Sequence, residues 1–180
     1  KGFNIGSAAT LRFTKSMGAS SNTAVLNIDT TTNKSHIMGG LHGSSVSIYV
    51  ANPNGIIVGP NAAISSGRSV GLISNNSSGG STLDSSSFGA GSGPYDGITF
   101  QGTQSSSGGT VKVNSGASLS GAHVLVAGSS NVNVGNLTKI TSPASANSHS
   151  ATLLAGEPGG TFATGTATTS NASAHMTVSG

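Results

Sequence analysis

Short apolar runs separated by turn-forming residues constrain the fold of this chain more than any other feature. Runs such as Val46-Ser47-Ile48-Tyr49-Val50 and Val111-Lys112-Val113 follow a period of two. Alternation over three to five residues is typical of half-buried β-strands, whose side chains point to opposite faces in turn. Almost every gap between runs contains Gly, Asn, Ser or Pro, which favour turns. The sequence therefore predicts an all-β fold with many short strands.

The apolar runs are spread along most of the chain. They occupy residues 24–28, 46–50, 56–58, 70–73, 111–113, 124–126, 132–134, 151–155 and 176–178. No window of 11 or more residues carries a helical pattern, although residues 7–15 leave room for one helical turn.

A β-solenoid fits these runs better than a sandwich or a barrel. Gly and Ser together make up about a third of the chain, and stacked coils need small residues where backbones approach closely. The runs between Lys112 and Val134 recur every 10 to 12 residues, so that two or three strands would complete one coil. A sandwich remains the alternative, because the sequence contains no strict repeat.

Charge and cysteine content exclude several classes of protein. Charged residues make up 6% of the chain, the net charge is +3, and the seven cations are scattered singly, so we expect no nucleic-acid partner. The absence of cysteine excludes a disulfide scaffold and a thiolate metal site. It also suits a chain that crosses a membrane unfolded. No run reaches the ~18 apolar residues of a membrane-spanning helix.

The most informative segment is Asn52-Pro53-Asn54-Gly55, which follows the run that ends at Val50. Pro53 presets φ for the second position of a type I turn, and Asn54 and Gly55 suit the third and fourth positions. The Asn52 side chain can accept a hydrogen bond from the backbone of the turn. We expect a rigid turn here and a second turn at residues 59–61, which together form a corner of a coil.

This segment and its surroundings resemble the NPNG signature and neighbouring motifs of two-partner secretion (TPS) domains. These domains are the N-terminal modules of filamentous-haemagglutinin-type exoproteins of Gram-negative bacteria. The resemblance covers residues 2 to 73 well and 110 to 135 loosely. Its supporting residues are Phe3, Asn4, Ile5, Asn27 and Gly39. Further similar stretches are residues 11–13, 22–26, 35–41 and 121–128.

The resemblance implies a right-handed parallel β-helix with an N-terminal cap and small extra-helical β-hairpins. It implies type V secretion through a partner, an outer-membrane barrel transporter with periplasmic transport-associated domains. The domain would then reach the cell surface or the medium and nucleate folding there, while downstream adhesin regions contact host ligands. We expect one monomeric domain over residues 1–180. The family's upstream segment is not recognisable, so we expect Lys1 to lie inside that domain.

Two other classes of function compete with secretion. An enzyme on a β-solenoid would need clustered carboxylates, and the four acidic residues are far apart: Asp29, Asp84, Asp96 and Glu157. The five histidines show no metal-ligand spacing, so we expect no catalytic residue, metal or cofactor. The second alternative is a free-standing β-solenoid that binds glycan or ice, or an autotransporter-passenger adhesin.

Residues 75–93 form a Ser/Gly-rich insert that is long for a loop in a compact domain. We expect either local disorder or a β-hairpin whose inward residues are Leu83 and Phe88. Residues 141–150 form a second excursion from the coils.

Overall fold

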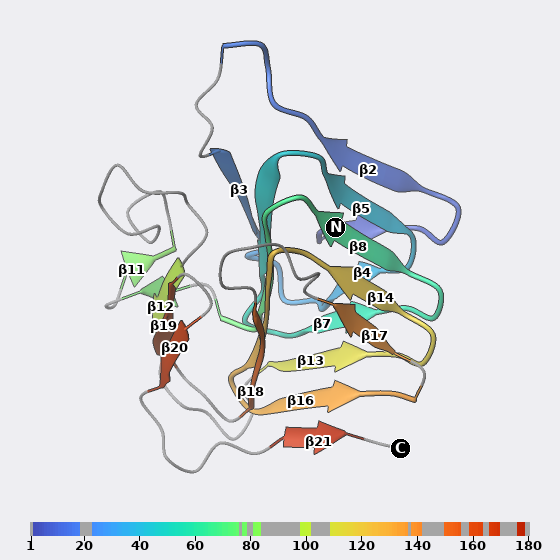
Figure 1. Ribbon diagram of the computed structural model, residues 1–180. Helices are drawn as coiled ribbons and strands as arrows, with labels where there is room; N and C mark the ends of the chain where they lie inside the picture. The colour runs from blue at the N-terminus through green and yellow to red at the C-terminus, as the bar shows by residue number, and fades with distance from the viewer. Residues whose placement is uncertain are drawn as a thin grey trace.

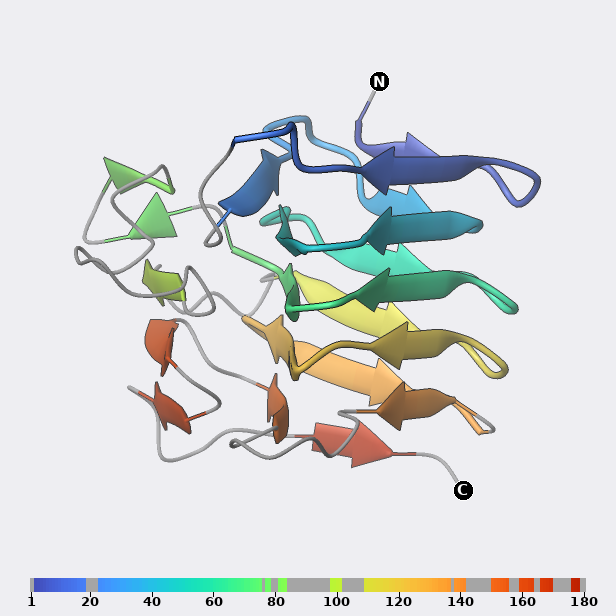
Figure 2. The same ribbon diagram turned by 45° about the horizontal axis from the view of Figure 1, so that its top comes forward.

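The computed structural model describes residues 2–18, 23–75, 77–78, 81–83, 98–101, 109–136, 138–141, 150–155, 159–163, 166–169 and 176–178. Its dominant feature is a stack of coils in which the chain passes through three parallel β-sheets in turn (Figure 1). This is a parallel β-helix, as the short runs and small residues predicted. Figure 2 shows the coils stacked between the two ends of the chain.

Three sheets, here called A, B and C, form the walls of the β-helix. Sheet A contains β1 (Asn4–Ile5), β4 (Ser35–Ile37), β7 (Ile56–Val58), β13 (Thr110–Val113), β16 (Asn131–Val134) and β21 (Met176–Val178). Sheet B contains β2 (Thr10–Phe13), β5 (Gly40–Gly43), β8 (Ala63–Ser66), β14 (Ser118–Ser120) and β17 (Lys139–Thr141). Sheet C contains β3 (Thr23–Ile28), β6 (Val46–Ala51), β9 (Ser69–Ile73), β15 (His123–Gly128) and β18 (Ser150–Ala155).

Each coil therefore uses one strand from every sheet. Ile37 is in register with Val58, and Val113 with Val134, so an uninterrupted coil spans 21 residues at this position. Two coils are widened by long excursions between β9 and β13 and between β18 and β21. The run spacing of 10 to 12 residues thus corresponds to about half a coil.

The core inside the coils is a column of aliphatic side chains that repeat at matching register positions. Its fully buried members include Ile37, Leu41, Ile64, Val111 and Leu119. Phe3, Leu11 and Phe13 of the first coil are partly buried against the N-terminal end of this column. The column explains why single apolar residues suffice in the short strands of sheet B.

Sheet C differs from the other two sheets because its central strands β6, β9 and β15 are buried on both faces. The outward residues of its strands form a second cluster with Leu83 and Ile98, which lie outside the coils. Tyr49 and Gly71 are register partners in this sheet, and a Cβ on Gly71 would collide with the Tyr49 ring. The Tyr49 ring therefore occupies space that any side chain at position 71 would fill.

The strands outside the coils come from both long excursions. β10 (Ser77–Ser78) and β11 (Ser81–Thr82) form an antiparallel hairpin inside the insert at residues 75–93, where a hairpin was one of two alternatives, but its paired strands do not include Leu83. β12 (Ile98–Gln101) pairs with β19 (Gly159–Ala163), which pairs with β20 (Thr166–Thr169), so one small sheet joins both excursions. Leu83 is buried as expected, whereas Phe88 and most of the excursion at residues 141–150 lie outside the described residues.

All nine predicted runs coincide with strands, but the single helical turn considered for residues 7–15 was wrong. β2 occupies Thr10–Phe13, where Leu11 and Phe13 alternate with polar residues and pack against the core. No helix long and apolar enough to cross a membrane occurs in the part of the chain that the structure describes.

Candidate functional site

The predicted turn at Asn52–Gly55 is present at the corner where β6 ends and β7 begins. The Asn52 carbonyl oxygen accepts a hydrogen bond from the Gly55 amide at 3.0 Å, which closes a four-residue β-turn. A type II turn would need a positive φ at Asn54, and among the described residues Asn61 is the only non-glycine with one. The geometry therefore matches the predicted type I turn.

The Asn52 side chain holds the turn from inside the protein. It is completely buried, and its Oδ1 accepts a hydrogen bond from the Asn54 amide at 2.8 Å. Its Nδ2 lies 2.9 Å from the Asn33 carbonyl oxygen, 2.9 Å from Ser35 Oγ and 3.2 Å from Asp29 Oδ2. Both ends of this amide are thus satisfied, as a buried polar group requires.

The Asp29 carboxylate lies at the centre of this network, a position that the sequence analysis did not predict. Its Oδ2 accepts hydrogen bonds from the Phe3 amide at 2.7 Å and from Ser35 Oγ at 2.8 Å, in addition to Asn52 Nδ2. Its Oδ1 accepts hydrogen bonds from the Thr31 amide at 3.0 Å and from the Thr31 hydroxyl at 2.7 Å. We call Asp29, Thr31, Ser35 and Asn52 the Asp29 network.

Hydrogen bonding keeps Asp29 ionised although only 4% of its surface is exposed. Burial raises the pKa of this carboxyl, but the donors from Thr31, Phe3 and Ser35 outweigh burial and lower the pKa from 3.8 to about 2. The carboxylate is therefore charged at neutral pH, and its charge-assisted hydrogen bonds link the first coil to the second.

Two further residues of the turn, Asn54 and Gly55, contact neighbouring coils. Gly55 has a φ of +113°, and a Cβ at this position would lie 2.7 Å from the Thr110 carbonyl oxygen on β13. Asn54 is exposed, and its Nδ2 donates to the Thr31 carbonyl oxygen at 2.6 Å. Glycine is thus required at the fourth position by backbone conformation and by the close approach of the next coil.

The five supporting residues occupy structural positions near the N-terminal end. Asn4 Oδ1 accepts a hydrogen bond from the His36 amide at 2.9 Å, and Asn27 Nδ2 donates to the Tyr49 carbonyl oxygen at 3.3 Å. Ile5 is buried in the core, and Phe3 is partly buried against it. A Cβ on Gly39 would collide with the carbonyl oxygens of residues 6 and 9. Phe3 alone of these residues donates to Asp29.

The second predicted turn is also present, but it lies at the corner between sheets A and B, whereas the Asn52–Gly55 turn lies between sheets C and A. The expectation that the two turns form a single corner was therefore wrong. The Ala62 amide donates to the Gly59 carbonyl oxygen at 3.2 Å, and Asn61 has a φ of 64°. A corresponding turn in the next coil joins Asn114 to Ala117, with Gly116 at a φ of 82°. Turns of one kind thus stack along this corner.

Asp29 is the one ionisable side chain in the Asp29 network. No group of three or more potential metal ligands comes together among the residues described by the structure. Asp29 is the only acidic residue in those ranges, and its oxygens already accept five hydrogen bonds. The other three acidic residues of the sequence lie outside them.

A scan against models of protein families finds no match to this chain, and searches of curated proteins and of solved structures find none either. Function is therefore inferred from the fold and from the geometry of the turn.

Proposed function

We propose that this chain is a secretion and targeting domain of a large exoprotein, exported by two-partner secretion. The observation that carries the proposal is the Asn52–Gly55 turn, whose buried Asn52 amide is held by Asp29 at the corner of a parallel β-helix. The tetrapeptide alone would be weak support for this function. Here it forms a fully hydrogen-bonded turn in a parallel β-helix, the fold that the resemblance implies, and this strengthens the proposal.

The proposed partner is an outer-membrane barrel transporter with periplasmic transport-associated domains. It would recognise the chain before folding, by pairing with segments that later become strands. β2 and β3 are terminal strands of their sheets, so their outer edges also suit strand addition. The exported chain would then nucleate the β-helix at the Asn52–Gly55 turn, at the surface of a Gram-negative cell or in the medium.

Export of turn variants tests this proposal. Asn52→Ala removes the side chain that accepts a hydrogen bond from the Asn54 amide, and Gly55→Ala places a Cβ against Thr110, so we expect both to lower export several-fold. The measurement is the amount of exoprotein secreted by cells that express it with the transporter encoded beside its gene.

Two control variants separate the role of the motif in export from the effect of lower stability and from the effect of losing an asparagine elsewhere on the β-helix. Leu119→Ala lowers core stability by about 2 to 5 kcal/mol at a position outside the motif, and Asn133→Ala changes an asparagine on the outer face of sheet A. Both should be exported better than the turn variants. Undiminished export of Asn52→Ala and Gly55→Ala would remove the assigned role.

A further inference from the structure

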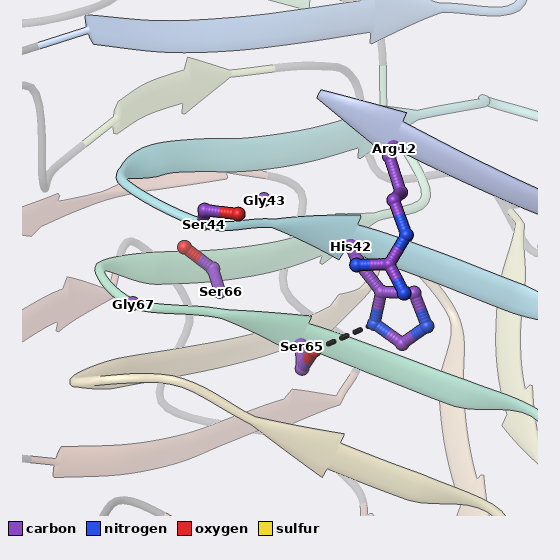
Figure 3. Close-up of a pocket in the computed structure, with 7 residues that line it drawn as sticks. All are labelled: Arg12, His42, Gly43, Ser44, Ser65, Ser66 and Gly67. Atoms are coloured by element: carbon purple, nitrogen blue, oxygen red, sulfur yellow. Dashed lines mark hydrogen bonds between the residues drawn. The ribbon is translucent and has the colours of Figure 1, made fainter. Parts of the chain in front are cut away.

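A polar hollow opens on the outer face of sheet B, on a different wall of the β-helix from the Asn52–Gly55 turn. Arg12 of β2, His42 of β5 and Ser65 of β8 are successive register partners. Their neighbours Leu11, Leu41 and Ile64 pack against the core, so these three side chains point outward. Figure 3 shows them around a hollow of about 270 Å³, which is also lined by residues 43, 44, 66 and 67.

Glycines at one end of sheet B border the hollow. The Gly67 amide donates to the Gly43 carbonyl oxygen at 3.0 Å, and a Cβ on Gly67 would collide with the Ser44 carbonyl oxygen. On the same strand as His42, a Cβ on Gly40 would lie 2.8 Å from His42 Nε2. Any side chain at position 40 would therefore displace the His42 imidazole.

Hydrogen bonding fixes the histidine within this hollow. His42 Nδ1 lies 2.7 Å from Ser65 Oγ, a contact drawn as a dashed line in Figure 3. When the ring is protonated, Nδ1 donates to Ser65 Oγ, and the Ser65 hydroxyl proton becomes available to a ligand. Arg12 adds a planar group with five donors, whose geometry matches two oxygens of a carboxylate, sulfate or phosphate.

The hollow carries positive charge without a matching carboxylate in the described part of the chain. Asp29 is the only acidic residue there, and its oxygens accept hydrogen bonds from the turn and from Phe3. A hollow of this size holds one small polar group and lies below the usual range for drug-sized ligands. The chemistry that fits is a compact anion with several acceptor oxygens.

We propose that Arg12, His42 and Ser65 form a binding site for an oxyanion, either a sulfate or a phosphate group. The anion comes from a substituent on a surface polymer or from the free ion, and both present the same oxygens. This site does not depend on the proposed secretion function. It gives the folded β-helix a ligand of its own.

Binding should tighten as the pH falls. Burial lowers the pKa of His42, and the positive charge of Arg12 lowers it further, so the ring is mostly neutral above pH 7. Arg12 is the charged group that faces the ring from β2, and β8 presents the Ser65 hydroxyl. Protonation at lower pH adds a second positive charge beside the anion.

A titration of the chain with sodium sulfate tests the site, followed by amide NMR shifts at constant ionic strength. We expect saturable shifts at residues 43, 44 and 67, with affinity at least threefold higher at pH 5 than at pH 7.5. Arg12→Gln should weaken binding at least tenfold, and His42→Gln should abolish the pH dependence. Lys112→Gln removes the same charge from the outer face of sheet A and should bind sulfate like the unaltered chain.

Parallel titrations with N-acetylglucosamine 6-sulfate and inorganic phosphate identify the source of the anion. Tighter binding of the sugar ester than of either free ion assigns the site to a polymer substituent, and the opposite order assigns it to the free ion. If Arg12→Gln does not fold, His42→Gln takes its place in the affinity comparison. Shifts that do not saturate, or equal affinities in Arg12→Gln and Lys112→Gln, would overturn the site.

Discussion

Asp29 ties together three segments that are far apart in the sequence. Its carboxylate accepts hydrogen bonds from Phe3 in the first coil, from Thr31 and from Ser35 at the start of β4, and from Asn52 after β6. Without it the Phe3 and Thr31 amides would lose this acceptor, and a buried unsatisfied group costs about 1 to 3 kcal/mol. One side chain therefore links the N-terminal end of the molecule to the turn proposed as the secretion motif.

Replacement of this carboxylate should destabilise the fold in a pH-dependent way. The pKa of Asp29 in the folded chain is about 2, below its usual 3.8, so the charge contributes about 2 kcal/mol at neutral pH. The contribution is present above pH 4 and is lost as the pH falls through 2. Asp29→Asn should lower the free energy of unfolding by at least this amount at pH 7, measured by urea titration.

The difference between Asp29→Asn and the unaltered chain should shrink steadily between pH 4 and pH 2. An equal difference at every pH would mean that packing, and not charge, accounts for the effect. Thr31→Val removes one donor but keeps the carboxylate. This variant should lose less stability than Asp29→Asn, and its free energy of unfolding should still fall between pH 4 and pH 2.

At the scale of elements, the strands of sheet C were predictable and those of sheet B were not. β6, β9 and β15 are buried on both faces, so their sequences are apolar over several consecutive residues. β5, β8 and β14 each contribute one large apolar residue to the core, namely Leu41, Ile64 and Leu119. Such strands are stabilised by stacking on neighbouring coils, and this cannot be recognised from local pattern.

The same limit applies to the candidate site. The Asn52–Gly55 turn was predictable because proline, asparagine and glycine have local backbone preferences. Asp29 was not, because Phe3 and Asn52 lie 26 and 23 residues away from it and only the coil register brings them together. The Arg12–His42–Ser65 hollow depends likewise on the register of three strands.

The corner between β4 and β5 gives a matched pair of glycine variants. A Cβ on Gly39 would collide with two backbone carbonyl oxygens of the first coil, whereas a Cβ on Gly6 meets nothing within 4 Å. Gly39→Ala should therefore cost several kcal/mol, because backbone has to shift. Gly6→Ala should change the free energy of unfolding by less than about 0.5 kcal/mol. Equal stabilities of the two variants in urea titration would show that the first coil is not held against the second at this corner.

At the scale of the whole molecule, the two long excursions meet on one wall of the β-helix. β12 belongs to the excursion after β9, and β19 belongs to the excursion after β18, yet the two strands are paired. Figure 1 shows this small sheet beside the strands of sheet C. Leu83 and Ile98 cover outward residues of sheet C, including Tyr49, Ile73 and Leu125. The excursions therefore complete a second apolar cluster that the coils cannot bury alone.

Truncation of Leu83 tests whether this cover stabilises the β-helix. Leu83 is 1% exposed, so Leu83→Ala should lower the free energy of unfolding by about 2 to 5 kcal/mol. Tyr49 belongs to the same cluster, and in a Tyr95→Phe background it is the only tyrosine, so its fluorescence reports on the cover. Acrylamide should quench Tyr49 more strongly in Leu83→Ala, because the ring then loses its covering side chain. Met17→Ala, at a fully exposed position, should change neither the stability nor the quenching. Unchanged quenching in Leu83→Ala would mean that the coils shield sheet C without the excursions.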